Sequence, residues 1–164
     1  MIAPQELAQR RAVIAEARSW IGTAYHHRQA VKARYDADGN RTSPGGVDCA
    51  TLLAQVYEAA GMTSPVPIPE YPPDWHMHRK TQRYADMVSE RSREISEAEA
   101  LPGDVVMYQF GLAFSHAAIV MPPGWPHIVH AFFGSRMVQA DHGDGGILGS
   151  DDGAPRPRRF FTVW

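Results

Sequence analysis

The sequence predicts an α+β fold in which N-terminal helices pack on a C-terminal antiparallel sheet of about five strands. Helical periodicity occurs only before residue 93, whereas five short stretches rich in β-branched and aromatic residues follow the LPGD turn at 101–104. Helices followed by a run of strands are typical of α+β domains. A chain of 164 residues is long enough to bury one core, so we expect a single domain spanning 1–164.

The first predicted element is a helix over residues 4–21. Pro4 suits the first turn of a helix, and Gly22 suits the position just beyond its end. The apolar residues expected to form its buried face are Leu7, Ile14, Ala17 and Ile21. From 23 to 46 this periodicity is lost, and the polar segment RYDADGNRTSPGG predicts a long surface loop.

A second helix is predicted to begin after Asp48, which is a suitable N-cap, and to end at Gly61. Its first turn contains Cys49, the single cysteine of the chain. Residues at helical spacing form its apolar stripe: Cys49, Leu52, Leu53, Val56, Tyr57 and Ala60. The proline-rich segment 64–75 is expected to be extended on the surface, and a shorter polar helix is expected at about 78–92.

The predicted strands are short and are separated by turn residues. They cover residues 104–110, 116–121, 127–133, 135–142 and 159–164. The basic run PRPRRF at 155–160 is short, and we expect it to be a solvated tail. The C-terminal segment that contains it could also be a docking segment or a last strand, and a last strand is the interpretation we favour.

Composition and charge exclude several classes of function. A formal net charge of −2 and a pI of about 6.4 argue against a nucleic-acid binder. One cysteine can form no internal disulfide and cannot supply a cysteine zinc site. The N-terminal residues lack the apolar core of a signal peptide, and no segment is long and apolar enough to span a membrane. We therefore expect a protein made in the cytoplasm without a signal peptide, and we expect no cofactor.

Cys49 is a candidate nucleophile because helix N-termini lower the pKa of a thiol. The alternative is a structural role, since free cysteines are often buried and Cys49 lies on the apolar stripe. A cysteine nucleophile needs a histidine base and a group that orients the base. His116 and His130 lie on consecutive predicted strands and could stand side by side. Each histidine alone is more typical of a structural position, but the three residues together indicate cysteine catalysis.

Two other motifs could suggest metal sites. His76 and His78 form an H-x-H pair, but no third ligand is evident. DADGN at 36–40 resembles the beginning of a calcium loop, yet its glycine comes too early and no glutamate closes it. We expect no metal site and a solvated turn at DADGN. His26 and His27 could contact a substrate.

Four motifs in order resemble the NlpC/P60 family of cysteine peptidases: DCATLL, LPGDVVMY, SHAAIVM and IVHA. The resemblance covers about residues 12–133. The opening WIGTAYHHRQAVKA is similar in particular to the branch found in phage tails and phage-like particles, in which W-x-G-T-x-Y-x-H precedes the cysteine. The resemblance implies a papain-like fold and cleavage of the peptide stems of the bacterial cell wall, usually at the γ-D-glutamyl–diamino acid bond.

By position, the resemblance implies a role for each matching residue. Cys49 is then the nucleophile, His116 the general base and His130 the orienting residue. Tyr25 matches a tyrosine beside the cysteine that helps to bind the oxyanion or substrate, and Asp48 matches a structural residue. His27 and Gln29 are further substrate candidates, although the separation of Tyr25 from Cys49 indicates an insertion near RYDADGNRTSP.

The partners implied are peptidoglycan and the tail or hub proteins of a phage or gene-transfer-like particle. We expect the chain in the tail or baseplate, acting in the host periplasm or cell wall. Two alternatives stay open: a catalytically inert structural component of a tail or baseplate with the same fold, and a related amidase or acyltransferase with the same catalytic residues.

Overall fold

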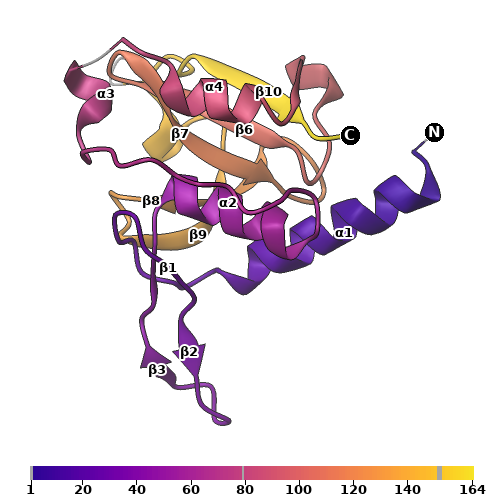
Figure 1. The fold of residues 1–164 in the computed structure, drawn as a ribbon, viewed down its shortest axis with the longest axis vertical. Coiled ribbons are helices and arrows are strands. Elements are labelled where there is room, and N and C mark those ends of the chain that lie inside the picture. Colours follow the sequence, from indigo (N-terminus) through magenta and orange to yellow (C-terminus); the bar gives the residue numbers. More distant parts are fainter. Residues whose placement is uncertain (1, 79, 151–152) are drawn as a thin grey trace.

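The computed structural model describes the chain except for residues 1, 79, 151 and 152 and the side chains of Trp75 and His76. Its helices precede its main sheet, as predicted (Figure 1). The α-helices are α1 (Pro4–Ser19), α2 (Cys49–Ala59), α3 (Trp75–His78) and α4 (Arg83–Ser89). Helix α2 packs on the sheet and α1 packs on α2. That residues 1–164 form one domain stays a prediction.

The main sheet is antiparallel and has six strands in the order β5-β10-β6-β7-β8-β9. The strands are β5 (Arg93–Ile95), β6 (Val105–Phe110), β7 (Ala113–Val120), β8 (His127–Phe132), β9 (Met137–His142) and β10 (Arg158–Thr162). The predicted α+β fold is confirmed with one strand more than expected. The missed strand, β5, has only three residues and shows no alternation that a pattern could detect.

The basic run near the C-terminus is not a solvated tail. Strand β10 lies inside the sheet, between β5 and β6. Arg158 forms ion pairs with Glu97 at 2.8 Å and Asp144 at 2.6 Å, and Arg159 pairs with Glu94 at 2.6 Å. The prediction of a tail was wrong because the acidic partners of these arginines lie far away in the sequence.

Helix α1 buries only part of the predicted face: Ala17 is buried and Ile14 packs against the core, but Leu7 and Ile21 do not. Leu7 and Ile21 are each 41% exposed, and the residues buried at this helix are Arg10, Val13, Ala17 and Trp20. Arg10 Nη1 lies 3.0 Å from Oδ1 of Asp104 in the LPGD turn and donates to the carbonyl oxygen of Pro102. An apolar pattern misses this face because a buried arginine paired with a carboxylate occupies its centre.

Residues 23–46 are not an irregular loop. Four short strands, β1 (Ala30–Val31), β2 (Arg34–Tyr35), β3 (Arg41–Ser43) and β4 (Gly46–Val47), pair as β1-β4 and β2-β3. They form a ribbon that projects from the body of the molecule (Figure 1). DADGN forms the turn at its tip, where Oδ1 of Asp36 accepts from the backbone N–H of Asp38 and Asn40. The strands were missed because each has only two or three residues and because β1, β2 and β3 are largely exposed and show no alternation of apolar residues.

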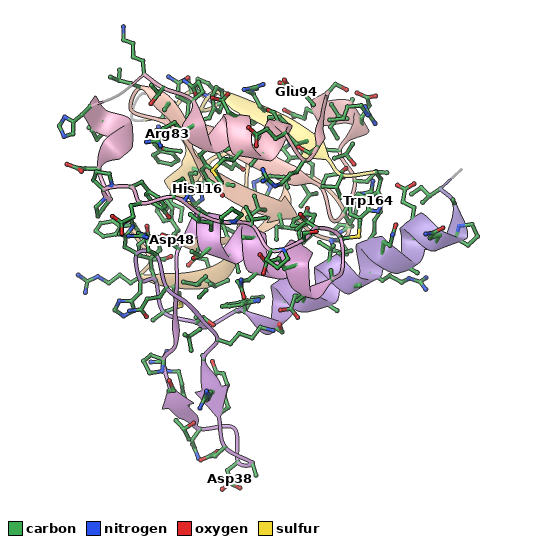
Figure 2. All side chains as sticks on the ribbon, viewed as in Figure 1. Asp38, Asp48, Arg83, Glu94, His116 and Trp164 are labelled. Atoms are coloured by element: carbon green, nitrogen blue, oxygen red, sulfur yellow. The ribbon has the colours of Figure 1, made fainter. Side chains whose placement is uncertain are left out.

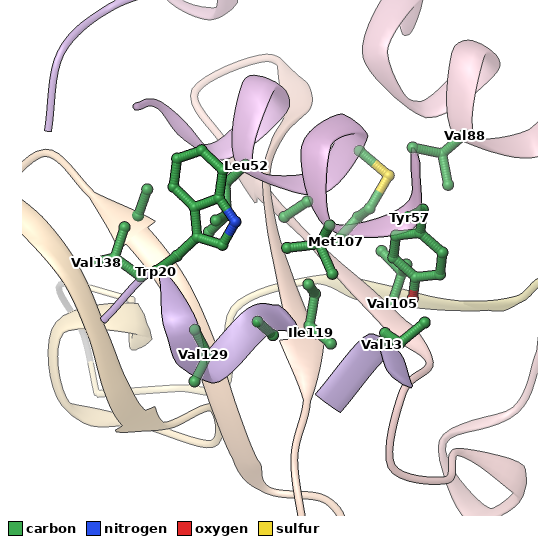
Figure 3. Packing of buried hydrophobic residues seen from close by; sticks show 14 of the residues in the cluster. Val13, Trp20, Leu52, Tyr57, Val88, Val105, Met107, Ile119, Val129 and Val138 are labelled. Carbon is green, nitrogen blue, oxygen red and sulfur yellow. The ribbon is translucent and has the colours of Figure 1, made fainter. Parts of the chain in front are cut away.

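Helix α2 begins and packs as the sequence predicts. Asp48 caps it by accepting from the backbone N–H of Thr51 at 2.9 Å. Leu52, Val56 and Tyr57 are buried in the main hydrophobic core. Figure 3 shows these contacts between α2, the end of α1 and the sheet, including Trp20, Leu52, Met107 and Ile119. This packing fixes the N-terminal end of α2 against strand β7.

The segment between α2 and α4 has little regular structure. Residues 64–72 contain no helix or strand, as predicted, but α3 begins at Trp75, inside the segment expected to be extended. Helix α4 is shorter than the predicted 78–92. We call residues 62–74 the strap. No helix among the described residues combines the length and the apolar character that crossing a membrane requires.

Candidate active site

The thiol of Cys49 lies against the backbone of β7 on both sides of His116. Its Sγ donates to the carbonyl oxygen of Ser115 at 3.6 Å, and the backbone N–H of Ala117 also acts on the sulfur. Asp48 and His116 lie near the same end of α2 (Figure 2). Cys49 is only partly exposed, and it lines one pocket together with His116. The structure therefore brings the predicted nucleophile and base to one place.

The prediction of a lowered thiol pKa was wrong. Burial, followed by the negative charge of Asp48, raises the pKa of Cys49 to about 12. The backbone N–H groups of Ala117, Cys49 and Ala50 lower this pKa, but by less than burial raises it. At neutral pH the thiol is therefore protonated in this structure, so a base must remove its proton during the reaction.

His116 and His130 stand side by side on β7 and β8, as the sequence predicts. Nε2 of His116 lies 2.9 Å from Nδ1 of His130, and the two rings meet edge to face. Burial is the main reason that the pKa of each histidine is lowered, that of His116 far below its usual value. Both rings are therefore neutral at pH 7. The recorded hydrogen bond of His116 uses Nε2, so Nδ1 is left for another partner.

A carboxylate that was not predicted from the sequence lies at the other ring nitrogen of His130. Oδ2 of Asp141, on β9, lies 3.3 Å from Nε2 of His130, at ion-pair distance but not aligned for a hydrogen bond. The sequence held a signal: residues 135–142 were predicted as the strand after His130, so alternation could have put Gln139 and Asp141 on one face with it.

The four predicted substrate contacts do not all reach the pocket, although His26 lines it. Tyr25 lines the pocket, and burial, followed by the negative charges of Cys49 when ionised and of Asp48, raises its pKa. His27 also lines the pocket, and its Nδ1 lies 3.5 Å from Oδ2 of Asp48. Gln29 is exposed and does not line the pocket; its side chain covers Gly46 instead.

Asp48 does more than cap α2. Its carboxylate is 2% exposed and accepts hydrogen bonds from the hydroxyl of Tyr71 at 2.6 Å and from the backbone N–H of Arg28 at 2.7 Å. His27 Nε2 donates to the carbonyl oxygen of Tyr71 at 2.8 Å. These hydrogen bonds hold Tyr71, and with it the strap, next to the start of α2. The sequence offered no signal for this contact, because Tyr71 lies in a segment without periodicity.

The pocket has a volume of about 960 Å³ and lies between α2, α4, the strap and the sheet. Much of its wall is apolar, including Leu53, Met62, Ile68, Met87, Phe110 and Phe132. Polar side chains line it as well, among them Tyr25, His27, Asp48, Tyr71 and Arg83. A mostly apolar cavity with a few polar groups beside a nucleophile is typical of an enzyme site.

The histidine pair H-x-H cannot be placed as a pair, because the side chain of His76 lies outside the described residues. His78 lies 3.2 Å from Asp74. In the described part of the chain, no group of three or more His, Cys, Asp or Glu side chains is arranged to hold a metal ion.

Comparison with protein families gives one match. Residues 32–148 match the profile described as "NlpC/P60 family". No curated protein sequence matches the chain significantly.

Solved structures share the fold at low sequence identity. The peptidoglycan hydrolase RipB from Mycobacterium tuberculosis matches with a TM-score of 0.58 and 18% identity, over 98% of this chain and 68% of that one. NlpC2 from Trichomonas vaginalis gives 0.60 and 16%, over 96% of this chain and 47% of that one. An N-acetylmuramoyl-L-alanine amidase from Bacteroides uniformis gives 0.52 and 10%, over 93% and 98%. The chain thus spans less than half of the NlpC2 chain.

Proposed function

The chain belongs to the NlpC/P60 family, and on this premise we propose that it is a cysteine peptidase that hydrolyses peptidoglycan. The observation that carries the proposal is that Cys49 and His116 line one pocket, with buried His130 in contact with His116. RipB, which shares the fold, is itself a peptidoglycan hydrolase.

The first chemical step is attack of the sulfur on an amide carbonyl. Because the thiol is protonated at rest, His116 takes its proton through Nδ1 as the carbon–sulfur bond forms. The proton leaves a positive charge on His116, and its Nε2–H donates to Nδ1 of His130, which spreads and orients that charge.

The tetrahedral oxyanion needs donors at the start of α2. The backbone N–H of Cys49 is one donor, and Tyr25 lies close enough to act on the same region. Collapse expels the amine, which takes the proton from His116 and leaves a thioester on Cys49. Water, deprotonated by His116, then attacks the thioester and releases the carboxylic acid and the thiol.

We infer that the bond cleaved is the γ-D-glutamyl–diamino acid bond of the stem peptide, on the basis of the four family motifs. Arg83 supports a substrate with free carboxylates, since it lines the pocket, is exposed and has no recorded ion pair in the described part of the chain.

We also propose that a phage or gene-transfer-like particle carries the chain in its tail or baseplate, bound to tail or hub proteins, for use in the host periplasm or cell wall. The support for this context is the W-x-G-T-x-Y-x-H stretch at residues 20–27. Strands β1, β2 and β3 of the ribbon are largely exposed and are therefore available for such a contact.

The test is digestion of purified peptidoglycan, with products identified by mass spectrometry. Wild type should release stem fragments cut after the γ-D-glutamyl residue. Cys49→Ala and His116→Ala should release none, because each removes a group that the first step requires. His127→Ala, which removes an exposed histidine of β8, should digest normally.

Each opposing outcome has a distinct meaning. Equal digestion by wild type and Cys49→Ala contradicts cysteine catalysis, and no digestion by either supports an inert structural component. Release of intact stem peptides from muramic acid supports an amidase, a possibility favoured by the fold shared with the Bacteroides uniformis amidase. Transfer of an acyl group from the thioester to an amine in place of water would identify an acyltransferase.

A further inference from the structure

We propose that Asp141 is a positioning residue that fixes the tautomers of His130 and His116, so that Nδ1 of His116 is the unprotonated nitrogen, free to act as the base for Cys49 in the same pocket. Its kinetic consequences depend on the proposed peptidase activity. Its effect on the two histidines does not, and both are tested below.

The sheet places Asp141 on the same face as His130. In the β8-β9 pair, His130 is opposite Gln139 and Ile128 is opposite Asp141, so Asp141 is the diagonal neighbour of His130. Oδ2 of Asp141 lies 3.3 Å from Nε2 of His130. Gln139 Nε2 donates to the same Oδ2 at 2.8 Å, and the backbone N–H of His142 donates to Oδ1 at 2.7 Å. The carboxylate is thus held in place from two directions.

The contact of Asp141 with Nε2 of His130 is important because this nitrogen is buried. His130 is 0% exposed. Among the buried side-chain nitrogen and oxygen atoms of the described residues, its Nε2 is the one without an aligned hydrogen bond. An unsatisfied buried polar atom is costly, so it should pair with the acceptor nearest to it. The Asp141 side chain is 24% exposed, so water can reach it.

The order of donors and acceptors then follows from the chemistry of the groups. A carboxylate only accepts, so Nε2 of His130 must carry its proton and Nδ1 of His130 must be the acceptor. Nε2 of His116, 2.9 Å from that Nδ1, must in turn be the donor. A neutral imidazole has one N–H, so Nδ1 of His116 is left with a free lone pair. This is the state that a base toward Cys49 requires.

The charges around the pair support the same role. Burial lowers the pKa of His130, and the negative charge of Asp141, 3.3 Å from Nε2, raises it. On His116, burial, His130 and Arg156 all act to lower the pKa. The other close neighbours are the uncharged rings of Tyr108, Phe110 and Phe132. Asp141 is therefore the acidic group in contact with the pair, and it acts on His116 through His130.

The decisive experiment compares Asp141→Asn with Asp141→Ala. Because the backbone N–H of His142 holds the oxygen at the Oδ1 position, asparagine should turn its NH₂ toward Nε2 of His130, and the Gln139 amide can turn to accept from the same NH₂. Nε2 of His130 then becomes an acceptor, and Nδ1 of His130 becomes a donor to Nε2 of His116. The proton of His116 is therefore on its Nδ1. Alanine removes the acceptor without adding a donor, so it leaves both tautomers accessible. Asparagine should therefore reduce kcat more than alanine does, although it is the more conservative change in shape.

For peptidoglycan fragments, we expect Asp141→Asn to lower kcat by about 10- to 100-fold with little change in KM. The acid limb of the kcat/KM profile should move to lower pH in both variants, since removal of the carboxylate lowers the pKa of the pair. Asp38→Asn, at the exposed tip of the ribbon, should change none of these values. A purely structural role predicts that alanine is at least as harmful as asparagine and that the pH profile keeps its position.

A measurement without substrate separates this inference from the proposed function. ¹⁵N NMR of the histidine rings should show the proton of wild-type His130 on Nε2 and that of His116 on Nε2, and the opposite tautomers in Asp141→Asn. If wild type fails to digest peptidoglycan but shows these tautomers, the inference stands without the function. If wild-type His130 carries its proton on Nδ1, or if the tautomers do not change in Asp141→Asn, the inference is wrong.

Discussion

At the scale of single residues, the surroundings of Cys49 decide its chemistry more than its place at a helix terminus does. The N–H groups at the start of α2 favour a thiolate, but burial and the adjacent carboxylate of Asp48 disfavour it more strongly. The same Asp48 caps α2 and accepts a hydrogen bond from the hydroxyl of Tyr71. One carboxylate thus stabilises the local fold and keeps the nucleophile protonated at rest.

Asp48→Asn should separate these two effects. Asparagine is as good an N-cap as aspartate, so α2 should keep its start. Loss of the negative charge should lower the pKa of Cys49, which is raised to about 12 in the native chain. Each unit of decrease multiplies the thiolate fraction at pH 8–9 by about ten. The measurement is the rate of Cys49 alkylation by iodoacetamide against pH.

Asp38→Asn is the control for this experiment, because it removes an exposed carboxylate of the ribbon. It should alkylate like wild type. A wild-type midpoint near the ordinary thiol value of about 8.5 would contradict the raised pKa of Cys49. An unchanged midpoint in Asp48→Asn would contradict the contribution of Asp48 to that pKa.

At the scale of elements, the ribbon and the strap frame the start of α2. Strand β4 ends at Val47, immediately before Asp48 and Cys49, so the base of the ribbon determines where the nucleophile lies. Gly45 at that base has φ +61°, and a Cβ there would stand 2.2 Å from the carbonyl oxygen of Val31. The close approach of two backbones at this point requires glycine.

Gly45→Ala should therefore destabilise the protein more than Gly39→Ala. Gly39, at the tip of the ribbon, has φ +83° but nothing within 4 Å of its would-be Cβ, so alanine there should cost only the backbone strain of about 1–2 kcal/mol. Gly45→Ala adds a clash with backbone atoms that cannot rotate away. Urea unfolding measures both, and equal losses of stability would refute the close packing at the ribbon base.

At the scale of the whole molecule, the sheet keeps two histidines uncharged in its interior. His116 is 7% exposed and His130 is 0% exposed, and both have pKa values below the usual 6.5. In the unfolded chain these histidines take up protons near pH 6.5, whereas in the folded chain they do so only at lower pH. The unfolded state therefore binds more protons below pH 6.5, and acid favours it.

These two histidines should leave the thermal midpoint nearly constant from pH 8 to 7. They should lower it as the pH decreases from about 6.5 to 5. The stability loss is at most about 1.4 kcal/mol per pH unit for each histidine. His130→Asn should make this dependence weaker, and His127→Ala, which alters an exposed histidine, should leave it unchanged. Calorimetry across this range checks the prediction, and an identical pH dependence in His130→Asn would oppose it.

Features with a local cause could be predicted from the sequence. The start of α2 follows from a cap and a helical stripe, and strands β6, β7, β8, β9 and β10 follow from apolar β-rich segments between turns. Because consecutive strands pair as neighbours in the sheet, the contact of His116 with His130 could also be predicted. The buried face of α1 could not, since it depends on an ion pair between Arg10 and a distant carboxylate.

The sequence by itself determined the class of fold, the helix that presents Cys49 and the two histidines that accompany it, because caps, periodicities and short motifs act within a few residues of chain. Only the tertiary structure decided the high pKa of the thiol, the contact of Tyr71 with Asp48, and the place of Asp141 behind His130. These depend on burial and on strand register, which arise when segments distant in sequence pack together.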